Sequence, residues 1–199
     1  MSNYKLEQSL FKAVKEDNKK KVDYILRLRC DVNAVDEKSR TPIMFAKSVD
    51  VADLLIKYGA ELTIWTLNDT HILHEVEDLD VLKFLVKKGA DVNCKNSEGI
   101  SPLMQASLYQ NKKRMEALLD VGADVNTVDN KNRTPIYMAV LWGSTWMIEL
   151  LVEKGAIVTE DIREIGSVTT KKTLDDAIKK RKANNGGNVF NIISNRFFR

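Results

Sequence analysis

The segment Gly122-Ala123-Asp124-Val125-Asn126 is followed, after a polar stretch, by Thr134-Pro135-Ile136-Tyr137-Met138-Ala139. Pro at the first helical position costs little, because its missing N–H would have no partner there, and the hydroxyl residue before it can cap the helix. Thr134-Pro135 therefore predicts a helix start. The other two prolines also follow hydroxyl residues, in Thr41-Pro42 and Ser101-Pro102. The spacings of 60 and 33 residues, with His71-Ile72 midway in the longer gap, indicate an internal repeat.

The pattern Gly-Ala-Asp-Val-Asn recurs, with substitutions, in five places. The copies are Arg29–Asn33, Gly59–Thr63, Gly89–Asn93, Gly122–Asn126 and Gly155–Thr159. An apolar stripe with helical spacing precedes each copy. The stripes are Val22/Ile25/Leu26, Val51/Leu54/Leu55, Val81/Leu82/Leu85, Met115/Leu118/Leu119 and Ile148/Leu150/Leu151. Shorter apolar helices are predicted at 43–46, 73–76, 103–106 and 136–139, so each unit is a short helix, a longer helix, a Gly cap and a polar turn.

This unit resembles the ankyrin repeat, whose Thr-Pro-Leu-His-x-Ala signature is matched by 41–46, 101–106 and 134–139. The resemblance covers residues 5–158 in five copies. It implies an all-α solenoid of helix-turn-helix units with hairpin-like fingers. One helix pair exposes an apolar face that it cannot bury alone, so neighbouring pairs stack.

The expected organisation is a repeat stack over 1–158, a C-terminal helical cap over 159–183 and a Gly-linked apolar and basic tail over 184–199. The repeats are expected at about 5–34, 35–64, 65–94, 95–127 and 128–158. Thr159-Glu160-Asp161 begins one cap helix, and Lys171–Lys182 forms a second with Leu174 and Ile178 on one face. The Lys-rich first copy is expected to be a polar capping repeat. The tail segment Val189–Arg199 is rich in Phe and Ile, and is expected either to fold back or to dock on a partner.

Copies two and three are short. Ala46 to Gly59 and Val76 to Gly89 are each 13 residues, whereas Ala106 to Gly122 and Ala139 to Gly155 are each 16. The missing residues come from the end of the first helix, so we expect a notch on the concave side, with room beside Trp65 and Tyr109. Both a partner site and a tolerated deletion are compatible with this loss.

Composition excludes several classes of protein. Of the 199 residues, 44% are hydrophobic and 30% are charged, which excludes a disordered chain and a disulfide-rich miniprotein. The net charge is +3, too small to indicate nucleic-acid binding. Two distant cysteines, and no long apolar stretch behind Met1–Lys5, predict a cytoplasmic protein or one exported into a host cell by an unconventional route.

No residue pattern predicts catalysis. His71 and His74 have the i,i+3 spacing of two metal ligands, but His74 falls where the ankyrin signature has its own packing His, so both are expected to be structural. Cys30 and Cys94 occupy small-residue positions of different repeats. The recurrent Asp residues share repeat positions, which explains them without acid–base chemistry. We expect no enzyme, no cofactor, no metal and no small-molecule substrate.

The ankyrin resemblance places partner contacts at the finger tips and at the exposed ends of the first helices. Trp, Tyr and Arg at such positions are typical of interface hot spots. The expected partner-binding residues are Val35, Lys38, Arg40, Trp65, Leu67, Asn68, Lys95, Glu98, Leu108, Tyr109, Lys131, Arg133, Leu141 and Trp142. The remaining finger positions are Glu37, Thr70, Ser97, Ile100, Val128 and Asn130.

The predicted function is therefore recognition of a partner protein, through the concave groove and the finger tips, by a monomeric, non-catalytic module of the effector, inhibitor or immunity, or scaffold type. One alternative is an adaptor that docks on a membrane surface or nucleic acid through basic C-terminal residues. These residues are Lys171, Lys172, Lys179, Lys180, Arg181, Lys182, Arg196 and Arg199. A regulatory piece of a larger enzyme complex is a third possibility.

Overall fold

The structure is a computed structural model that describes residues 3–184. The chain divides into two compact units after Ser97, and each unit is described by itself. All regular elements of residues 3–184 are helices, with one isolated β-bridge between Trp65 and His71, so the all-α prediction is confirmed. The tail segment Val189–Arg199 lies outside the described residues.

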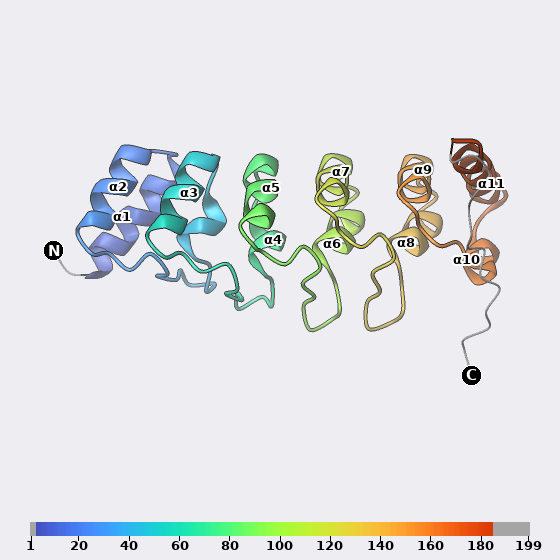
Figure 1. Cartoon of the computed structure of the whole chain (residues 1–199). Coiled ribbons are helices and arrows are strands. Elements are labelled where there is room, and N and C mark those ends of the chain that lie inside the picture. Colours follow the sequence, from blue (N-terminus) through green and yellow to red (C-terminus); the bar gives the residue numbers. More distant parts are fainter. Residues whose placement is uncertain (1–2, 185–199) are drawn as a thin grey trace. The chain divides into compact units, whose positions relative to one another are not determined.

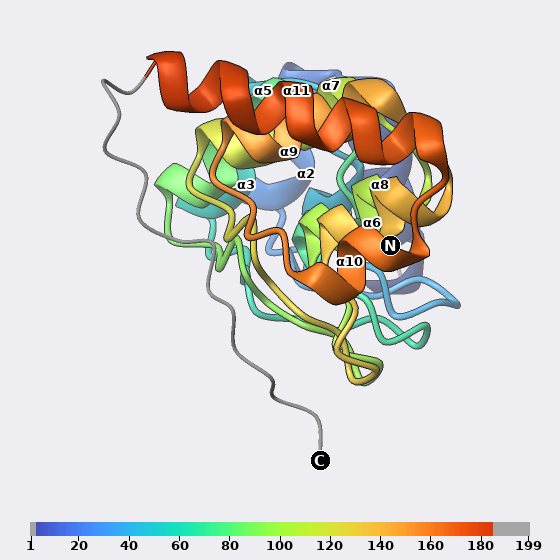
Figure 2. The same cartoon turned by 90° about the vertical axis from the view of Figure 1, so that its right-hand side faces the viewer.

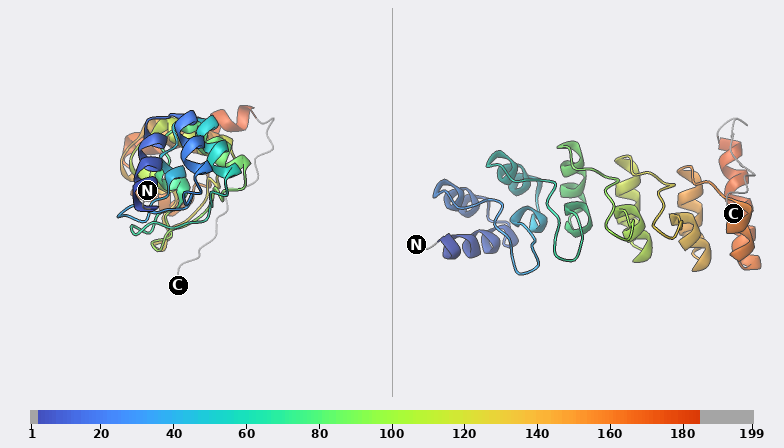
Figure 3. Two further views of the ribbon diagram at one scale, coloured as in Figure 1. Left: turned by 90° about the vertical axis from the view of Figure 1, so that its left-hand side faces the viewer. Right: turned by 90° about the horizontal axis from the view of Figure 1, so that it is seen from below.

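The first unit contains three pairs of helices, visible from the side in Figure 1 and from below in Figure 3. They are α1 (Asn3–Lys15) with α2 (Lys19–Arg27), the 3₁₀-helix η1 (Pro42–Phe45) with α3 (Val49–Lys57), and α4 (Ile72–Glu75) with α5 (Leu79–Lys87). η1 packs against α1 and α4, while α3 packs against α2 and α5. First helices thus contact first helices, and second helices contact second helices.

The second unit contains three further pairs. They are α6 (Pro102–Leu108) with α7 (Lys112–Asp120), α8 (Pro135–Leu141) with α9 (Thr145–Glu153), and α10 (Glu160–Ile165) with α11 (Val168–Asn184). α8 packs against both α6 and α10, and α11 lies along α9. The cap predicted over 159–183 is thus a sixth helix pair, whose first helix begins at the capping residue Thr159 without a finger before it.

The predicted helix starts are confirmed, with one difference in their capping. The hydroxyls of Ser101 and Thr134 accept the backbone N–H of the third helical residue, at 3.3 and 3.2 Å. Thr41 makes no such bond. η1 is a 3₁₀ turn, so the Met44 N–H is taken instead by the Thr41 carbonyl at 3.1 Å, and the Thr41 hydroxyl is buried without a partner.

The second helix of each of the first five pairs ends in a left-handed residue, as the Gly pattern predicts. Gly122 and Gly155 have φ of 92° and 105°, a conformation that costs little without a Cβ atom. In the first copy, Arg29 takes the same conformation with φ of 60°.

The apolar stripes form the cores. Val22, Ile25 and Leu55 are buried in the first unit, and Met115, Leu118 and Leu151 in the second. Because the same repeat position is buried each time, the helical phase derived from the sequence is correct. The first helices also differ in length as predicted, since η1 and α4 have four residues where α6 and α8 have seven.

Candidate functional site

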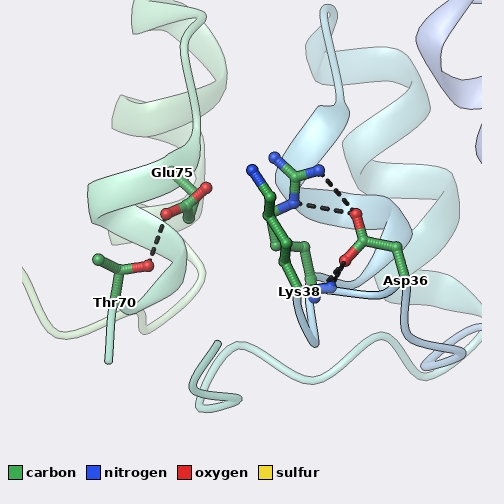
Figure 4. A network of polar contacts seen from close by, with 5 residues as sticks. Asp36, Lys38, Thr70 and Glu75 are labelled. Carbon is green, nitrogen blue, oxygen red and sulfur yellow. Dashed lines mark hydrogen bonds and ion pairs between the residues drawn. The ribbon is translucent and has the colours of Figure 1, made fainter. Parts of the chain in front are cut away.

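The first and fourth fingers are closed by the same ion pair. In the first finger, Nε and Nη2 of Arg40 donate to Oδ2 of Asp36 at 2.9 and 2.7 Å. Oδ1 of Asp36 accepts the backbone N–H groups of Lys38 and Arg40 (Figure 4). Asp129 and Arg133 repeat this arrangement in the fourth finger. The recurrent Asp at this position therefore builds the turn, which explains its repetition without chemistry.

These contacts keep the carboxyl groups of Asp36 and Asp129 ionised. Burial alone raises the pKa of Asp129, but the hydrogen bonds from the Arg133 side chain and from the backbone N–H groups of Arg133 and Lys131 outweigh it. The pKa of Asp129 is therefore below its ordinary value. Asp36 shows the same balance with Arg40 and Lys38. Both fingers are held by ionised groups at neutral pH.

The second finger uses hydroxyl groups instead of an ion pair. Thr66 occupies the place of Asp36, and its hydroxyl accepts the Thr70 N–H at 3.2 Å. The Thr70 hydroxyl donates to Glu75 at the end of α4, at 2.5 Å (Figure 4). The finger is thereby tied to the shortened helix that follows it.

Neighbouring finger tips are joined by backbone hydrogen bonds within each unit. The Leu67 N–H donates to the Lys38 carbonyl at 2.9 Å, and the Asn130 N–H donates to the Glu98 carbonyl at 3.0 Å. Gly99, with φ of 77°, allows the close approach in the second unit, because a Cβ atom there would lie 2.6 Å from Oδ1 of Asn130. The tips therefore present an ordered surface.

Both histidines are structural in their contacts. His71 takes the N-cap position of α4, and its N–H donates to Nδ1 of His74 at 3.2 Å. The Trp65 ring lies 5.4 Å from the His71 ring, and Nδ1 of His71 is buried without a partner. Burial lowers the pKa of His71, and the charge of Asp91 partly opposes this shift. Trp65 thus covers a neutral imidazole on one of its faces.

The cysteines are free, buried thiols. Burial raises the pKa of Cys30 to about 11 and that of Cys94 to about 12. The thiolate is the nucleophilic and metal-binding form, so neither group is activated for such chemistry. Within residues 3–184, no group of three or more His, Cys, Asp or Glu side chains is placed to hold a metal ion.

The ends of α6 and α8 expose large apolar side chains in the second unit. Tyr109, directly after α6, is 78% exposed, and Leu141 and Trp142 at the end of α8 are 54% and 39% exposed. Tyr109 and Trp142 occupy the same repeat position, and α6 packs against α8. The core of the unit does not use these side chains.

The predicted partner-binding residues divide between the two units. In the first unit Val35, Lys38, Trp65, Leu67, Asn68 and Lys95 are exposed, and Arg40 is half-buried. In the second unit Glu98, Tyr109, Lys131, Leu141 and Trp142 are exposed, and Leu108 and Arg133 are half-buried. The two arginines are the ones bound to the finger carboxylates, so their guanidinium groups already have a partner.

A cavity of about 130 Å³ lies in the first unit where the shortened first helices end. It is lined by Lys15, Arg40, Met44, Phe45, Ala46, Lys47, Glu75, Glu77 and Asp78. Nζ of Lys15 and the Arg40 guanidinium lie 4.2 and 4.6 Å from the Phe45 ring centre. A notch is therefore present where the shortened helices end. Its lining includes neither Trp65 nor Tyr109, so this cavity is not the space predicted beside these two residues.

Two features were not predicted from the sequence. The side-chain amide of Asn126 accepts the Ile157 N–H at 2.9 Å and donates to the Gly155 carbonyl, and Asn33 makes the same two contacts with Glu61 and Gly59. The sequence did contain a signal for these contacts, because Asn recurs at the end of the Gly-Ala-Asp-Val-Asn segment. The second feature is the exposed pair Ile165 and Val168, which flank the turn between α10 and α11.

None of the helices in the described part of the chain combines the length and apolar character that crossing a membrane requires. The basic residues of α11 are on its surface, and Lys171, Lys172, Lys179, Lys180 and Lys182 are exposed. Arg196 and Arg199 lie beyond the described residues.

Comparison with known proteins supports the fold. Residues 70–161 match the family model for ankyrin repeats (3 copies). An ankyrin repeat protein of Fowlpox virus (strain NVSL) is 30% identical over 86 residues, which are 40% of this chain and 13% of the viral protein. The B-cell lymphoma 3 protein homolog of Mus musculus is 32% identical over 111 residues, which are 52% of this chain and 25% of the mouse protein.

The matched segments thus cover a quarter or less of each relative's length. Ankyrin repeats are protein–protein interaction modules that present extended binding surfaces. The helix pairs, the left-handed Gly caps, the fingers and the matched segment agree with one another. Over residues 70–161, a little under half of its length, the chain matches the ankyrin-repeat family.

Proposed function

We propose that the chain is a non-catalytic recognition module that binds a partner protein through its finger tips and the ends of its first helices. The observation that carries this proposal is the exposure of Tyr109, Leu141 and Trp142 on two packed helices. Large aromatic side chains with one polar group contribute much binding energy while keeping a free surface soluble. A surface held by short, ordered helices also loses little conformational entropy on binding.

The finger tips add polar recognition to these apolar anchors. Lys38 in the first unit and Lys131 in the second extend from turns that are held by Asp36 and Asp129. Their backbone is fixed while their side chains are exposed. Arg40 and Arg133 do not contact the partner in this proposal. Their guanidinium groups bind Asp36 and Asp129, and so they hold the finger turns in shape.

The test first uses the full chain as bait to capture the partner. The dissociation constant of the captured partner is then measured for the wild type and for each variant. Tyr109→Ala and Trp142→Ala should each weaken binding by roughly 30-fold, the equivalent of about 2 kcal/mol for a truncated hot spot. Lys154→Ala is a control, since this lysine caps the end of the second helix α9 and pairs with Asp120 at the end of α7, whereas Tyr109 and Trp142 cap the first helices α6 and α8. Unchanged affinity in both aromatic variants, with normal thermal midpoints, would reject the proposal.

A second candidate is the adaptor that docks on anionic surfaces through α11. It is favoured by Lys171, Lys172 and Lys179, which are exposed and make no ion pair among residues 3–184. Salt-sensitive binding to anionic vesicles or to oligonucleotides, with no effect of Trp142→Ala, would identify this function instead.

A further inference from the structure

The apolar surface of the second unit extends beyond α6 and α8 onto the last helix pair. Leu108, Leu141 and Ile165 are the final residues of α6, α8 and α10, so they lie at the C-terminal ends of three successive first helices, of which α10 is one residue shorter than the other two. Ile165 is 42% exposed and Val168, at the start of α11, is 87% exposed. We call the exposed side chains at these ends the helix-end patch. It consists of Tyr109, Leu141, Trp142, Ile165 and Val168.

The contacts of two glycines show that these residues are neighbours. A Cβ atom on Gly166, next to Ile165, would lie 3.1 Å from Cγ1 of Val140 at the end of α8. A Cβ atom on Gly143, next to Trp142, would lie 3.8 Å from Cγ2 of Thr170 in the first turn of α11. Figure 1 shows α6, α8 and α10 following one another along the unit, and in the end-on view of Figure 2 α10 and α11 lie in front of the helices on which they pack. The ends of α8 and α10 and the first turn of α11 are therefore in contact, and α6 packs against α8 beside them.

Basic side chains border the patch. Lys171 and Lys172 follow Val168 by three and four residues, so they lie on the same face of α11. Lys112 and Lys113 begin α7, just after the turn that follows Tyr109. Lys113, Lys171 and Lys172 are exposed, and no ion pair engages them among residues 3–184, whereas Lys112 pairs with Glu116 at 4.0 Å. The border also contains carboxylates: Glu164 adjoins Ile165, and Asp175 and Asp176 lie one turn beyond Lys171 and Lys172. Because Asp175 pairs with Arg163 at 2.7 Å, the border keeps a small excess of positive charge.

We infer that the helix-end patch binds an amphipathic helix of the partner, with acidic residues beside its apolar stripe. Packed helices lie roughly 8–10 Å apart, so a patch across three helix ends spans about 20 Å. An α-helix covers that length in about 13 residues, and its i, i+3, i+4, i+7 stripe matches an elongated apolar surface. Acidic side chains complement the lysine border and steer the encounter. The inference rests on the proposed function and specifies the partner's chemistry.

Two synthetic amphipathic helices of about 18 residues serve as probes, with the same Leu stripe and flanks of either Glu or Lys. Binding is followed by isothermal titration calorimetry with the full chain. The Glu-flanked helix is expected to bind at least about tenfold more tightly than the Lys-flanked helix, because its charges complement the border. Ile165→Ser/Val168→Ser should weaken this binding by about tenfold or more, since truncating buried interface contacts costs affinity.

A charge reversal gives the sharpest control. Lys171→Glu/Lys172→Glu is expected to reverse the preference between the two helices. Lys179→Glu/Lys182→Glu introduces the same charges about two to three turns further along α11, and it should leave the preference unchanged. Circular dichroism of each variant establishes that it remains folded.

Several outcomes would overturn the inference. These are binding of neither helix, equal binding of both, or a preference that the reversal does not change. Binding to vesicles of phosphatidylserine and phosphatidylcholine, with neither helix bound, would assign the patch to a membrane surface instead. Suppose that Trp142→Ala abolishes binding of the captured partner, whereas the variants at 165, 168, 171 and 172 bind it like wild type. The proposed function is then supported and this inference is wrong.

Discussion

Nη2 of Arg133 lies 2.6 Å from Oδ2 of Asp129, whose side chain is 1% exposed. The same finger is closed by the Asp129 N–H, which donates to the Arg133 carbonyl at 3.1 Å. Side chain and backbone of these two residues thus hold both ends of one turn. The finger has its shape before any partner arrives, which is why its exposed lysine can serve recognition at low entropic cost.

The ion pair should contribute stability that depends on pH. Asp129→Asn keeps an oxygen that can accept the backbone N–H groups but removes the charge, so it should lower the free energy of unfolding by about 1–3 kcal/mol at pH 7. The pKa of Asp129 is lowered in the folded protein from 3.8. The contribution is therefore present above about pH 4 and is lost as the pH falls through the folded-state pKa.

Urea unfolding of wild type and Asp129→Asn at pH 7 and at pH 3 measures this difference. The gap between the two proteins should narrow at the lower pH. A gap of the same size at both values would show that the charge is not what stabilises the finger.

The helical phase can be tested by a matched pair of substitutions, one in the fourth repeat and one in the finger that follows it. Leu118 is fully buried, so Leu118→Ala should lower the free energy of unfolding by about 2–5 kcal/mol. Lys131→Ala, at an exposed finger position, should change it by no more than about 0.5 kcal/mol. Chemical denaturation compares them directly, and equal effects would mean that the repeat phase is wrong.

Most of the helical architecture could be predicted because it depends on local signals. Thr134-Pro135 and Gly155 mark where a helix starts and where one ends, and each acts through its own backbone preference. The lengths of η1 and α4 follow from counting residues between such signals. These predictions need no knowledge of what lies across the fold.

The remaining features depend on contacts between segments far apart in the sequence. Ile165 and Val168 carry no repeat signature, since α10 has no Thr-Pro start and no finger, and only its packing on α8 places them beside Trp142. Trp65 was predicted as a partner contact, but its ring also lies against His71. Thr41 was expected to cap its helix, and the tighter 3₁₀ turn removes that bond.

The side-chain amide of Asn126 should stabilise the junction between the fourth and fifth repeats. Asn126→Ala leaves the Ile157 N–H without its acceptor, so it should lower the free energy of unfolding by about 1–2 kcal/mol. Hydrogen exchange of the Ile157 amide should accelerate in the variant. Lys131→Ala is the control, because this side chain is exposed and the Lys131 backbone N–H, which donates to Asp129, is retained. An unchanged exchange rate at Ile157 would contradict the assigned contact.

His71 should act as an internal quencher of Trp65 fluorescence at low pH. Protonated imidazole quenches a nearby indole, and the two ring centres are 5.4 Å apart. Because burial lowers the pKa of His71 from 6.5, the folded state favours the neutral ring. The corresponding stability is present above about pH 6.5 and is lost as the pH falls.

A Trp142→Phe/Trp146→Phe background isolates the signal of Trp65. Its fluorescence should drop on acidification with a midpoint below pH 6.5 while the helical circular dichroism is retained. His71→Gln should abolish the transition. A midpoint at or above 6.5, or a transition that survives the substitution, would show that His71 is not the buried neutral ring described above.

The most direct test of protein recognition at the helix ends is the dissociation constant of the captured partner for three forms of the chain. These are wild type, Tyr109→Ala/Trp142→Ala, and a chain that ends at Asn184. The account predicts that the double variant binds at least about 30-fold more weakly, with its thermal midpoint little changed, while the shortened chain binds like wild type. Normal binding by the double variant, together with loss of binding by the shortened chain, would contradict it and place recognition in the C-terminal tail.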